Sequence, residues 1–435
     1  MTDLSGSAPD AGTETVFTYG APGLKFGTGA SDEIGYDLSQ YAVKRVLVIT
    51  DPGVAATGHP QRVAEQMDRF GIEAAVFDGV HVEPTDASLE AAVAHARATG
   101  PWDAFVAVGG GSAIDTAKAV NLLTTNDGEL MDYINAPVGK ARAPQHPLKP
   151  LVAVPTTTGT GAESTTICVL DVLALKVKTG ISHARLRPTL AVVDPALTLS
   201  QPAGVTAAAG MDILCHALES YTARSFTSYD RKRPEQRVPY CGSNPISDVW
   251  SENALSLLAT SFRQAVHHGD DPAARGQMAL AATMAGLGFG NAGVHIPHAN
   301  AYPIAGRVHD RCPDFRPDGY AADEAMVPHG MAVSLTAPEA FRWTFESSPE
   351  RHLRAAALLA PDHGYDGPDA LPRVLADLMR DIALPNGLGE VGYDEGDVDD
   401  LVAGTMQQQR LLATAPRPVT EDDAAGILTR SLELW

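Results

Sequence analysis

Four side chains in the second half of the chain have the types and spacing of a transition-metal site. Asp212 and His216 stand four residues apart in GMDILCHALESY, so on a helix both leave the same face, one turn apart. His298 lies in GVHIPHANAYPIAG and His329 in AMVPHGMAV. One carboxylate oxygen and three imidazole nitrogens suit Fe²⁺ and also Zn²⁺. A divalent metal held there would act as a Lewis acid on a substrate oxygen.

Two neighbouring residues are rival ligands on chemical grounds. Cys215 directly precedes His216, and His295 precedes His298 by three positions. Adjacent residues on a helix diverge by about 100°, so Cys215 is expected to lie in the core. His295 remains open between a ligand and a structural side chain on this reasoning alone.

The composition is that of a globular protein with two domains. A chain of 435 residues, 44% hydrophobic and 20% charged, exceeds one ordinary core and contains no apolar run long enough for a transmembrane helix. The net charge of −21 argues against nucleic acid and anionic membranes as partners, but it does not exclude small anionic substrates. Residues 1–16 are polar and lack signal- or transit-peptide features, so we expect a disordered tail and a cytoplasmic protein.

The pattern of the chain changes near residue 200. Before it, β-branched runs alternate with helical stretches, which predicts a mostly parallel sheet with helices on both faces. The expected strands are 45–50, 74–78, 104–108, 150–155 and 190–195. After residue 200 the periodicity is helical, interrupted by two Pro- and charge-rich loops at roughly 223–246 and 306–325. We therefore expect an α/β domain over 17–200 and an all-α domain over 201–435.

A glycine-rich turn in the first half could hold a phosphate. Gly109, Gly110, Gly111 and Ser112 follow the expected strand AFVAV and open the helix AIDTAKAV. Glycines let the backbone approach a ligand, and a helix N-terminus offers free N–H groups to an anion. The alternative is a tight strand–helix turn without a ligand.

Further polar residues follow other strands of this half. Asp51 could accept the two hydroxyls of an adenine ribose and repel a 2′-phosphate, which favours NAD over NADP, or it could simply cap the turn in DPG. Thr156, Thr157 and Thr160, in PTTTGTGAE, could bind the diphosphate or the nicotinamide ribose, or form local turns. Lys178, in KVKTGI, is a candidate charge beside the cofactor.

These stretches together resemble the iron-containing (group III) alcohol dehydrogenase family. The matching segments are GGGSAIDTAK, PTTTGTGAE, RPTLAVVDP, GMDILCHALESY, HANAYPIAG and VPHGMA, in the family's order from about residue 20 to the C-terminus. The resemblance implies a dehydroquinate synthase-like fold, with an N-terminal NAD(P)-binding α/β domain, a helical C-terminal domain and the active site in the cleft between them. We also expect a homo-oligomer, a dimer.

The resemblance also implies roles for individual residues. It makes Asp212, His216, His298 and His329 the metal ligands, because HANAYPIAG aligns with the family segment HGxAHxLG and puts His298, rather than His295, at the ligand position. It places the Gly109–Ser112 loop on the pyrophosphate and Asp51 on the adenine ribose. The remaining residues implied at the cofactor are Asp115, Thr156, Thr157, Thr160 and Lys178.

Two departures from the family pattern point to a subfamily. The family often has a second histidine four residues after the ligand, where this chain has Tyr302, which could donate a hydrogen bond but would not be a neutral-pH base. His329 follows His298 by 31 positions, more than in simple members. Together with VPYCGSNPISDVW and FGNAGVHIPHANAYPIAG, this resembles the hydroxyacid–oxoacid transhydrogenases.

That subfamily transfers hydride from a hydroxyacid, such as 4-hydroxybutyrate or 3-hydroxybutyrate, to 2-oxoglutarate, giving 2-hydroxyglutarate. Tyr302 and His298 would then lie at the reacting centre. Loop cations are candidates for binding substrate carboxylates, by bidentate contacts in the case of arginine; they are Arg224, Arg231, Lys232, Arg233, Arg237, Arg307, Arg311 and Arg316. The main alternative is an ordinary NAD-dependent alcohol or aldehyde dehydrogenase that releases its cofactor; a lyase of the same fold and a metal-binding protein without activity are further alternatives.

Overall fold

The computed structural model describes residues 12–175, 177–320, 325–362 and 364–435, which form two compact units. One unit is residues 21–200, and the other joins residues 12–20 to residues 201–435. Residues 17–20, which we expected in the α/β domain, therefore belong to the helical unit. Residues 1–11 of the expected disordered tail lie outside the described residues.

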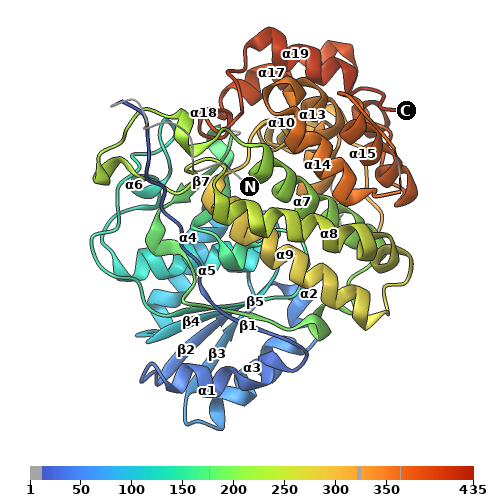
Figure 1. Ribbon diagram of the computed structural model, residues 1–435. Coiled ribbons are helices and arrows are strands. Elements are labelled where there is room, and N and C mark those ends of the chain that lie inside the picture. The colour runs from blue at the N-terminus through green and yellow to red at the C-terminus, as the bar shows by residue number, and fades with distance from the viewer. Residues whose placement is uncertain (1–11, 176, 321–324, 363) are drawn as a thin grey trace. The chain divides into compact units, whose positions relative to one another are not determined.

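The unit of residues 21–200 is built on a six-stranded sheet in which all pairs of strands are parallel. The strands lie in the order β1 (Gly23–Phe26), β8 (Leu190–Val193), β5 (Leu151–Pro155), β4 (Ala104–Gly109), β2 (Arg45–Ile49) and β3 (Glu73–Phe77) (Figure 1). Each of the five expected strands corresponds to one of these. The predicted parallel sheet is confirmed.

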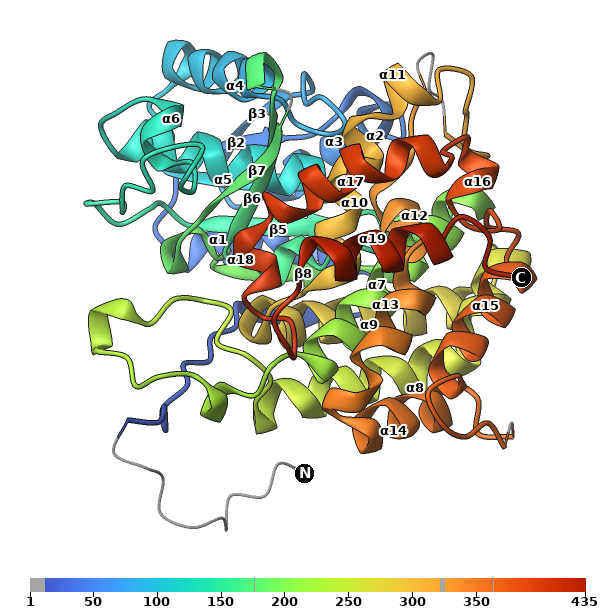
Figure 2. The same ribbon diagram turned by 90° about the horizontal axis from the view of Figure 1, so that it is seen from above.

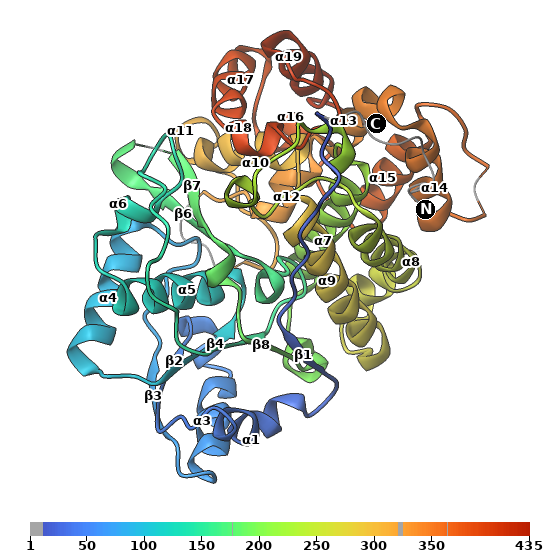
Figure 3. The same ribbon diagram turned by 60° about the vertical axis from the view of Figure 1, so that its left-hand side comes forward.

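Helices cover both faces of this sheet, as the apolar strands require. Alternate side chains point to opposite faces, so Leu47 and Phe105 join one hydrophobic cluster and Val48 and Val106 join another. The first cluster includes α4 (Asp86–Thr99) and α5 (Gly111–Thr125), and the second includes α1 (Ile34–Ser39) and α3 (His59–Asp68). Figure 3 shows the two pairs of helices on opposite sides of the strands. The short helices of this unit are α2 (Pro52–Ala55) and α6 (Leu130–Tyr133).

Three strands were missed by the sequence analysis. β1 is a short edge strand whose residues are mostly exposed, so it lacks a buried apolar run. β6 (Ile167–Val172) and β7 (Val177–Ser182) form a separate antiparallel hairpin, and β7 contains a lysine and a glycine that obscure its pattern. Lys178, a candidate cofactor residue, lies on this hairpin.

The helical unit is organised around one buried helix. α7 (Ala203–Thr222) is buried over most of its circumference and packs against α8 (Pro245–His267), α9 (Pro272–Ala292) and α12 (His329–Ser334). α10 (Ile296–Gly306) packs against α12 and α17 (Val398–Met406), and α17 packs against α19 (Glu421–Arg430) (Figure 2). The other helices are α11 (Val308–Arg311), α13 (Ala337–Thr344), α14 (Pro349–Leu359), α15 (Ala370–Asp381), α16 (Leu388–Val391) and α18 (Gln409–Leu412).

Residues 12–16, the described part of the expected tail, pack against the rest of the helical unit. Glu14 is 4% exposed, and its carboxylate accepts hydrogen bonds from the backbone N–H of Lys232 at 3.0 Å and from Arg237 at 2.9 Å. Phe17 packs edge-on against Phe226, with 4.9 Å between ring centroids. The prediction of disorder up to residue 16 is therefore wrong for residues 12–16, because a buried ion pair and backbone hydrogen bonds hold them against the loop that follows α7.

Candidate active site

Helix α7 presents three polar side chains on one buried face. Asp212, His216 and Glu219 are 2%, 4% and 0% exposed, and their spacing of four and three residues places them on successive turns of the same face. The predicted helical placement of Asp212 and His216 thus agrees with the structure. Glu219 was not singled out from the sequence, although it completes the same spacing.

Helix α12 approaches α7 closely because its second residue is a glycine. A Cβ built on Gly330 would lie 2.1 Å from the backbone oxygen of Ala208 and 2.8 Å from Cβ of Asp212. No side chain fits into that space, so only glycine allows this approach. The contact brings His329, the first residue of α12, next to Asp212.

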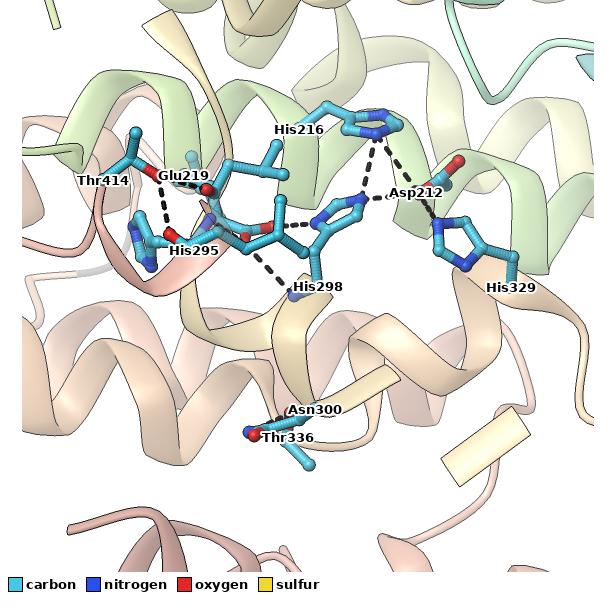
Figure 4. A network of polar contacts seen from close by, with 12 residues as sticks. Asp212, His216, Glu219, His295, His298, Asn300, His329, Thr336 and Thr414 are labelled. Carbon is cyan, nitrogen blue, oxygen red and sulfur yellow. Dashed lines mark hydrogen bonds and ion pairs between the residues drawn. The ribbon is translucent and has the colours of Figure 1, made fainter. Parts of the chain in front are cut away.

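The four expected ligand atoms converge in space (Figure 4). Oδ1 of Asp212 lies 3.4 Å from Nε2 of His298, 3.7 Å from Nε2 of His216 and 3.9 Å from Nε2 of His329. The Nε2 atoms of His298 and His216 are 2.9 Å apart. Ligand atoms about 2.1 Å from a tetrahedral ion stand about 3.4 Å from each other, so this spacing suits a metal.

The donor chemistry fits a metal as well as the distances do. Oδ1 of Asp212 is buried and makes no hydrogen bond among the described residues, an expensive arrangement unless a cation completes it. His329 is the most accessible member of the cluster, with 25% of its side chain exposed. The cluster is therefore most accessible from the side of His329.

The electrostatics of the cluster also favour a cation. Burial alone would raise the pKa of Asp212, but His216, His329 and His298 lower it below its usual value. Burial lowers the pKa of His216 to about 3. Burial also opposes charge on His298, yet Glu219 and Asp212 outweigh it and raise the pKa of His298 to about 9. Two buried carboxylates thus give the cluster a negative potential that attracts either a proton or a metal ion.

The structure separates the two rival histidines. Nδ1 of His298 donates to the carboxylate of Glu219, and its Nε2 faces the cluster. His295 instead points away, with Nε2 3.1 Å from the hydroxyl of Thr222 (Figure 4). Of these two, only His298 belongs with Asp212 and His329 to a group that could hold a metal ion.

Tyr302 lies beside this cluster. It follows His298 by one turn of α10, and its ring centroid is 6.1 Å from that of His329, with the planes inclined by 37°. The side chain is partly exposed. This position is compatible with the expected contact to a substrate held at the cluster.

In the α/β unit the glycine turn lies at the carboxyl edge of the sheet. β4 leads into Gly109 and Gly110, and α5 begins at Gly111 with no capping side chain among the described residues. A Cβ on Gly111 would lie 2.8 Å from Cγ2 of Thr160, and a Cβ on Gly110 would lie 3.1 Å from Oγ1 of Thr157. The glycine turn and the threonine loop are therefore in contact, as two halves of one cradle.

Asp51 lies at the same edge, at the point where strand order reverses. It follows β2, the neighbour of β4, and its Oδ1 accepts from the N–H of Val54 at 2.9 Å as the cap of α2. Oδ2 would be 3.5 Å from a Cβ on Gly109. Ligands of open α/β sheets bind at such reversal points, outside the carboxyl ends of the strands. Asp51 thus both caps a turn and lies beside the glycine loop.

Two expected cofactor residues have partners inside the unit. Asp115 is 7% exposed, and its carboxylate accepts from the Lys118 ammonium at 3.2 Å and from the N–H of Val169 at 2.9 Å. This differs from the expected cofactor contact, because the side chain joins α5 to β6 instead. The Ser112 hydroxyl likewise accepts from the N–H of Glu83 at 3.1 Å, and its own O–H remains a donor.

Lys178 is held between two carboxylates. Its Nζ lies 2.7 Å from Glu83 and 2.8 Å from Asp171. Burial favours the neutral form, but the two carboxylates outweigh it and raise the pKa of Lys178 above its usual value. The lysine is thus a fixed positive charge on the β6–β7 hairpin.

Three of the eight loop cations expected at the substrate carboxylate are paired with acids of the protein. Arg307 lies 2.8 Å from Asp400, and Arg311 lies 2.7 Å from Asp400 and 3.2 Å from Asp397. Arg237 is paired with Glu14. That Arg307 and Arg311 bind substrate stays a prediction; in this structure Asp400 of α17 and Asp397, directly before α17, are their counter-ions.

Comparison with known proteins places the chain in a family. The profile described as iron-containing alcohol dehydrogenase matches residues 22–195. The profile described as Fe-containing alcohol dehydrogenase family, C-terminal, matches residues 235–311 and 322–432. The chain belongs to the iron-containing alcohol dehydrogenase family. It is therefore an oxidoreductase, and the resemblance described from its motifs is confirmed.

Individual members of the family resemble the chain over nearly its whole length. The mitochondrial hydroxyacid-oxoacid transhydrogenase of Bos taurus is 43% identical over 97% of this chain and 91% of its own. A crystal structure of 1,3-propanediol oxidoreductase has a TM-score of 0.82 at 29% identity, covering 96% of this chain and 100% of the other. The sulfoacetaldehyde reductase of Bifidobacterium kashiwanohense, solved in complex with NAD+, has a TM-score of 0.78 at 26% identity, covering 95% and 98%.

The transhydrogenases of Bos taurus and Xenopus laevis that resemble the chain are named mitochondrial, which does not support the cytoplasmic location expected for this chain. None of the helices in the described part of the chain combines the length and apolar character that crossing a bilayer would need.

Proposed function

We propose that the protein is a metal- and NAD-dependent hydroxyacid–oxoacid transhydrogenase. It moves hydride from a hydroxyacid of the 4-hydroxybutyrate or 3-hydroxybutyrate type to 2-oxoglutarate, giving 2-hydroxyglutarate. The observation that carries the proposal is the convergence of Asp212 Oδ1 with the Nε2 atoms of three histidines. The choice of substrates is supported by relatives of that name, 43% identical over 97% of the chain.

The metal ion, Fe²⁺ or Zn²⁺, is held by Asp212, His216, His298 and His329. When bound, it supplies Lewis acidity toward the oxygen of the hydroxyl or carbonyl group that reacts. His216 is kept in place by stacking on Phe289, with 3.8 Å between centroids and planes inclined by 7°. His298 is kept in place by its hydrogen bond to Glu219, described above.

NAD is held at the carboxyl edge of the sheet of the α/β unit. The backbone of Gly109, Gly110, Gly111 and Ser112 and the first turn of α5 bind the pyrophosphate. Asp51 accepts the adenine ribose hydroxyls and disfavours a 2′-phosphate. Thr156, Thr157, Thr160 and Lys178 lie toward the nicotinamide ribose. Asp115 supports this loop through Lys118 rather than by touching the cofactor.

Tyr302 acts at the reacting centre as a hydrogen-bond donor. Its hydroxyl steadies the substrate oxygen beside His329 and His298, and a phenol is too weak a base at neutral pH to replace a histidine. Retention of NADH between the two half-reactions distinguishes the transhydrogenase from a dehydrogenase that releases its cofactor.

A substrate-pair assay tests this function. The purified protein, freed of unbound nucleotide, is mixed with 4-hydroxybutyrate and 2-oxoglutarate without added NAD, and 2-hydroxyglutarate is measured alongside the iron and zinc content. Production over many turnovers per cofactor bound is the expected result. Turnover only in proportion to added NAD would identify an ordinary alcohol or aldehyde dehydrogenase instead. Omission of 2-oxoglutarate is the control.

A further inference from the structure

Glu219 is a buried carboxylate whose recorded partners all belong to the start of α10. It is 0% exposed. Its Oε1 accepts from the backbone N–H of His295 at 2.8 Å and of His298 at 3.2 Å, and its Oε2 accepts from Nδ1 of His298. No lysine or arginine is among its partners in the described chain. Burying a carboxylate costs desolvation free energy, and here only N–H groups of one helical turn compensate for that cost. We therefore ask what this carboxylate does for that turn.

The carboxylate comes from the helix that also carries two expected ligands. Glu219 follows His216 by three residues and Asp212 by seven, so all three side chains leave one face of α7. α7 therefore provides Asp212 and His216 directly and holds His298 through Glu219. One helix determines the positions of three of the four converging groups.

The hydrogen bond to Glu219 determines which nitrogen of His298 faces the cluster. With Nδ1–H directed at the carboxylate, Nε2 is the nitrogen through which the ring would bind a metal in place of a proton, and this atom lies 3.4 Å from Asp212 and 2.9 Å from His216. The same carboxylate satisfies two N–H groups that α10, having no side-chain cap of its own at His295, leaves open at its N-terminus. The orientation of the His298 ring and the N-terminus of α10 thus both depend on the side chain of Glu219.

We propose that Glu219 is the positioning residue of the metal centre: it fixes the tautomer and direction of His298 and so sets the affinity for the metal. This inference rests on the proposed function, because it assumes that His298 is a ligand. Carboxylates that accept from the far nitrogen of a ligating histidine typically change metal affinity by about 10–100-fold when removed.

The decisive variant is Glu219→Gln. A glutamine has one acceptor and one donor group, so if its oxygen keeps the backbone N–H groups, its amide nitrogen faces Nδ1 of His298. The ring must then accept at Nδ1 and carry its proton on Nε2, where it cannot bind a metal. We expect affinity for Zn²⁺, measured by chelator competition, to fall about 10–100-fold, and the visible spectrum of the Co²⁺-substituted protein to change.

Glu339→Gln is the matched control. Glu339 is also buried on a helix of this unit, at 7% exposure, but its partners are Arg342 and Arg430. This variant should lose stability without changing metal affinity or the Co²⁺ spectrum. If Glu219→Gln behaves in the same way, the inference is overturned, because its role is then only structural. A wild-type protein that binds no metal would instead overturn the proposed metal centre itself.

A second measurement covers the case in which Glu219→Gln does not fold. Nitrogen NMR of the histidine-labelled wild-type protein, loaded with Zn²⁺, reports the protonation of both ring nitrogens. The proposal requires His298 to carry its proton on Nδ1 and to bind the metal through Nε2. The opposite assignment contradicts it.

Discussion

His295 and His298 lie in one short segment, yet their ring nitrogens have different surroundings. Nε2 of His298 faces Asp212, whereas Nε2 of His295 reaches the hydroxyl of Thr222. Both are almost fully buried, at 0% and 3% exposure, so burial does not tell them apart. Their partners do, and from those partners we infer that His298 is the metal ligand and that His295 packs against α7.

Replacing each histidine separately tests that assignment. We expect His298→Ala to lower metal affinity by more than about 100-fold and to abolish turnover, because a ligand is lost. His295→Ala should keep the metal and lose about 1–3 kcal/mol of stability, because Thr222 loses a buried partner. Metal analysis after gel filtration and urea unfolding report the two effects. Loss of metal from His295→Ala with retention in His298→Ala would reverse the assignment.

The site residues that could be predicted from the sequence are those marked by a local pattern, either helical spacing or a motif. Asp212 and His216 are related by helical spacing, and the motif register selected His298. Glu219 has the same spacing, but its importance depends on donors from α10, which no local pattern reveals. The pairing of Arg307 and Arg311 with Asp400 was missed for the same reason, since Asp400 lies far along the chain on α17.

At the level of elements, the buried strands of the sheet and α7 were easier to predict than α10. Four strands, β2, β4, β5 and β8, are short runs of buried apolar residues, and such runs are recognisable in the sequence. α10 is buried on all sides from Ile296 to Ala301 and contains Pro297 and Pro303, so it has no amphipathic stripe. Its N-terminal N–H groups are satisfied by Glu219 of another helix, so no N-cap side chain marks its start, and Pro297 in the first turn is the signal that remains.

The contact between α7 and α12 gives a test at this scale. In Gly330→Ala the added Cβ would meet the backbone oxygen of Ala208 at 2.1 Å, which forces the two helices apart. His329 then moves away from Asp212, and we expect metal affinity to fall by about tenfold or more, with a loss of roughly 1–3 kcal/mol of stability.

Gly276→Ala is the control for that change. Gly276 lies on α9 with nothing within 4 Å of a built Cβ. The alanine should leave metal binding unchanged and stabilise the helix by up to about 1 kcal/mol. Equal metal affinity in the Gly330 and Gly276 variants would show that the close approach of α12 does not matter for the site.

On the scale of the whole chain, the division into an α/β part and a helical part was visible in the periodicity, but the position of the N-terminal segment was not. Residues 12–20 belong to the helical unit although they precede the sheet in sequence. Glu14 meets its partner Arg237 across more than half of the chain. Contacts of such range follow from the completed fold, because local composition marks these residues only as polar.

A buried histidine makes the stability of the folded chain depend on pH. His352 is 1% exposed between Phe341 and Phe345; its Nδ1 lies 2.8 Å from the carbonyl of Ser348 and its Nε2 2.8 Å from the hydroxyl of Thr344. Burial lowers its pKa to about 4. In the unfolded chain His352 has an ordinary pKa of about 6.5, so between that pH and about 4 it binds a proton in the unfolded state but not in the folded state.

The sign of the effect follows from that difference. Stability from His352 is complete above the unfolded pKa and is lost as the pH falls from about 6.5 toward about 4. Between about pH 7 and about pH 5 we expect the wild type to lose about 2 kcal/mol more than His352→Gln, which cannot titrate. Urea unfolding of both proteins at the two pH values measures this. Parallel losses in the two proteins would mean that His352 accepts its proton in the folded state.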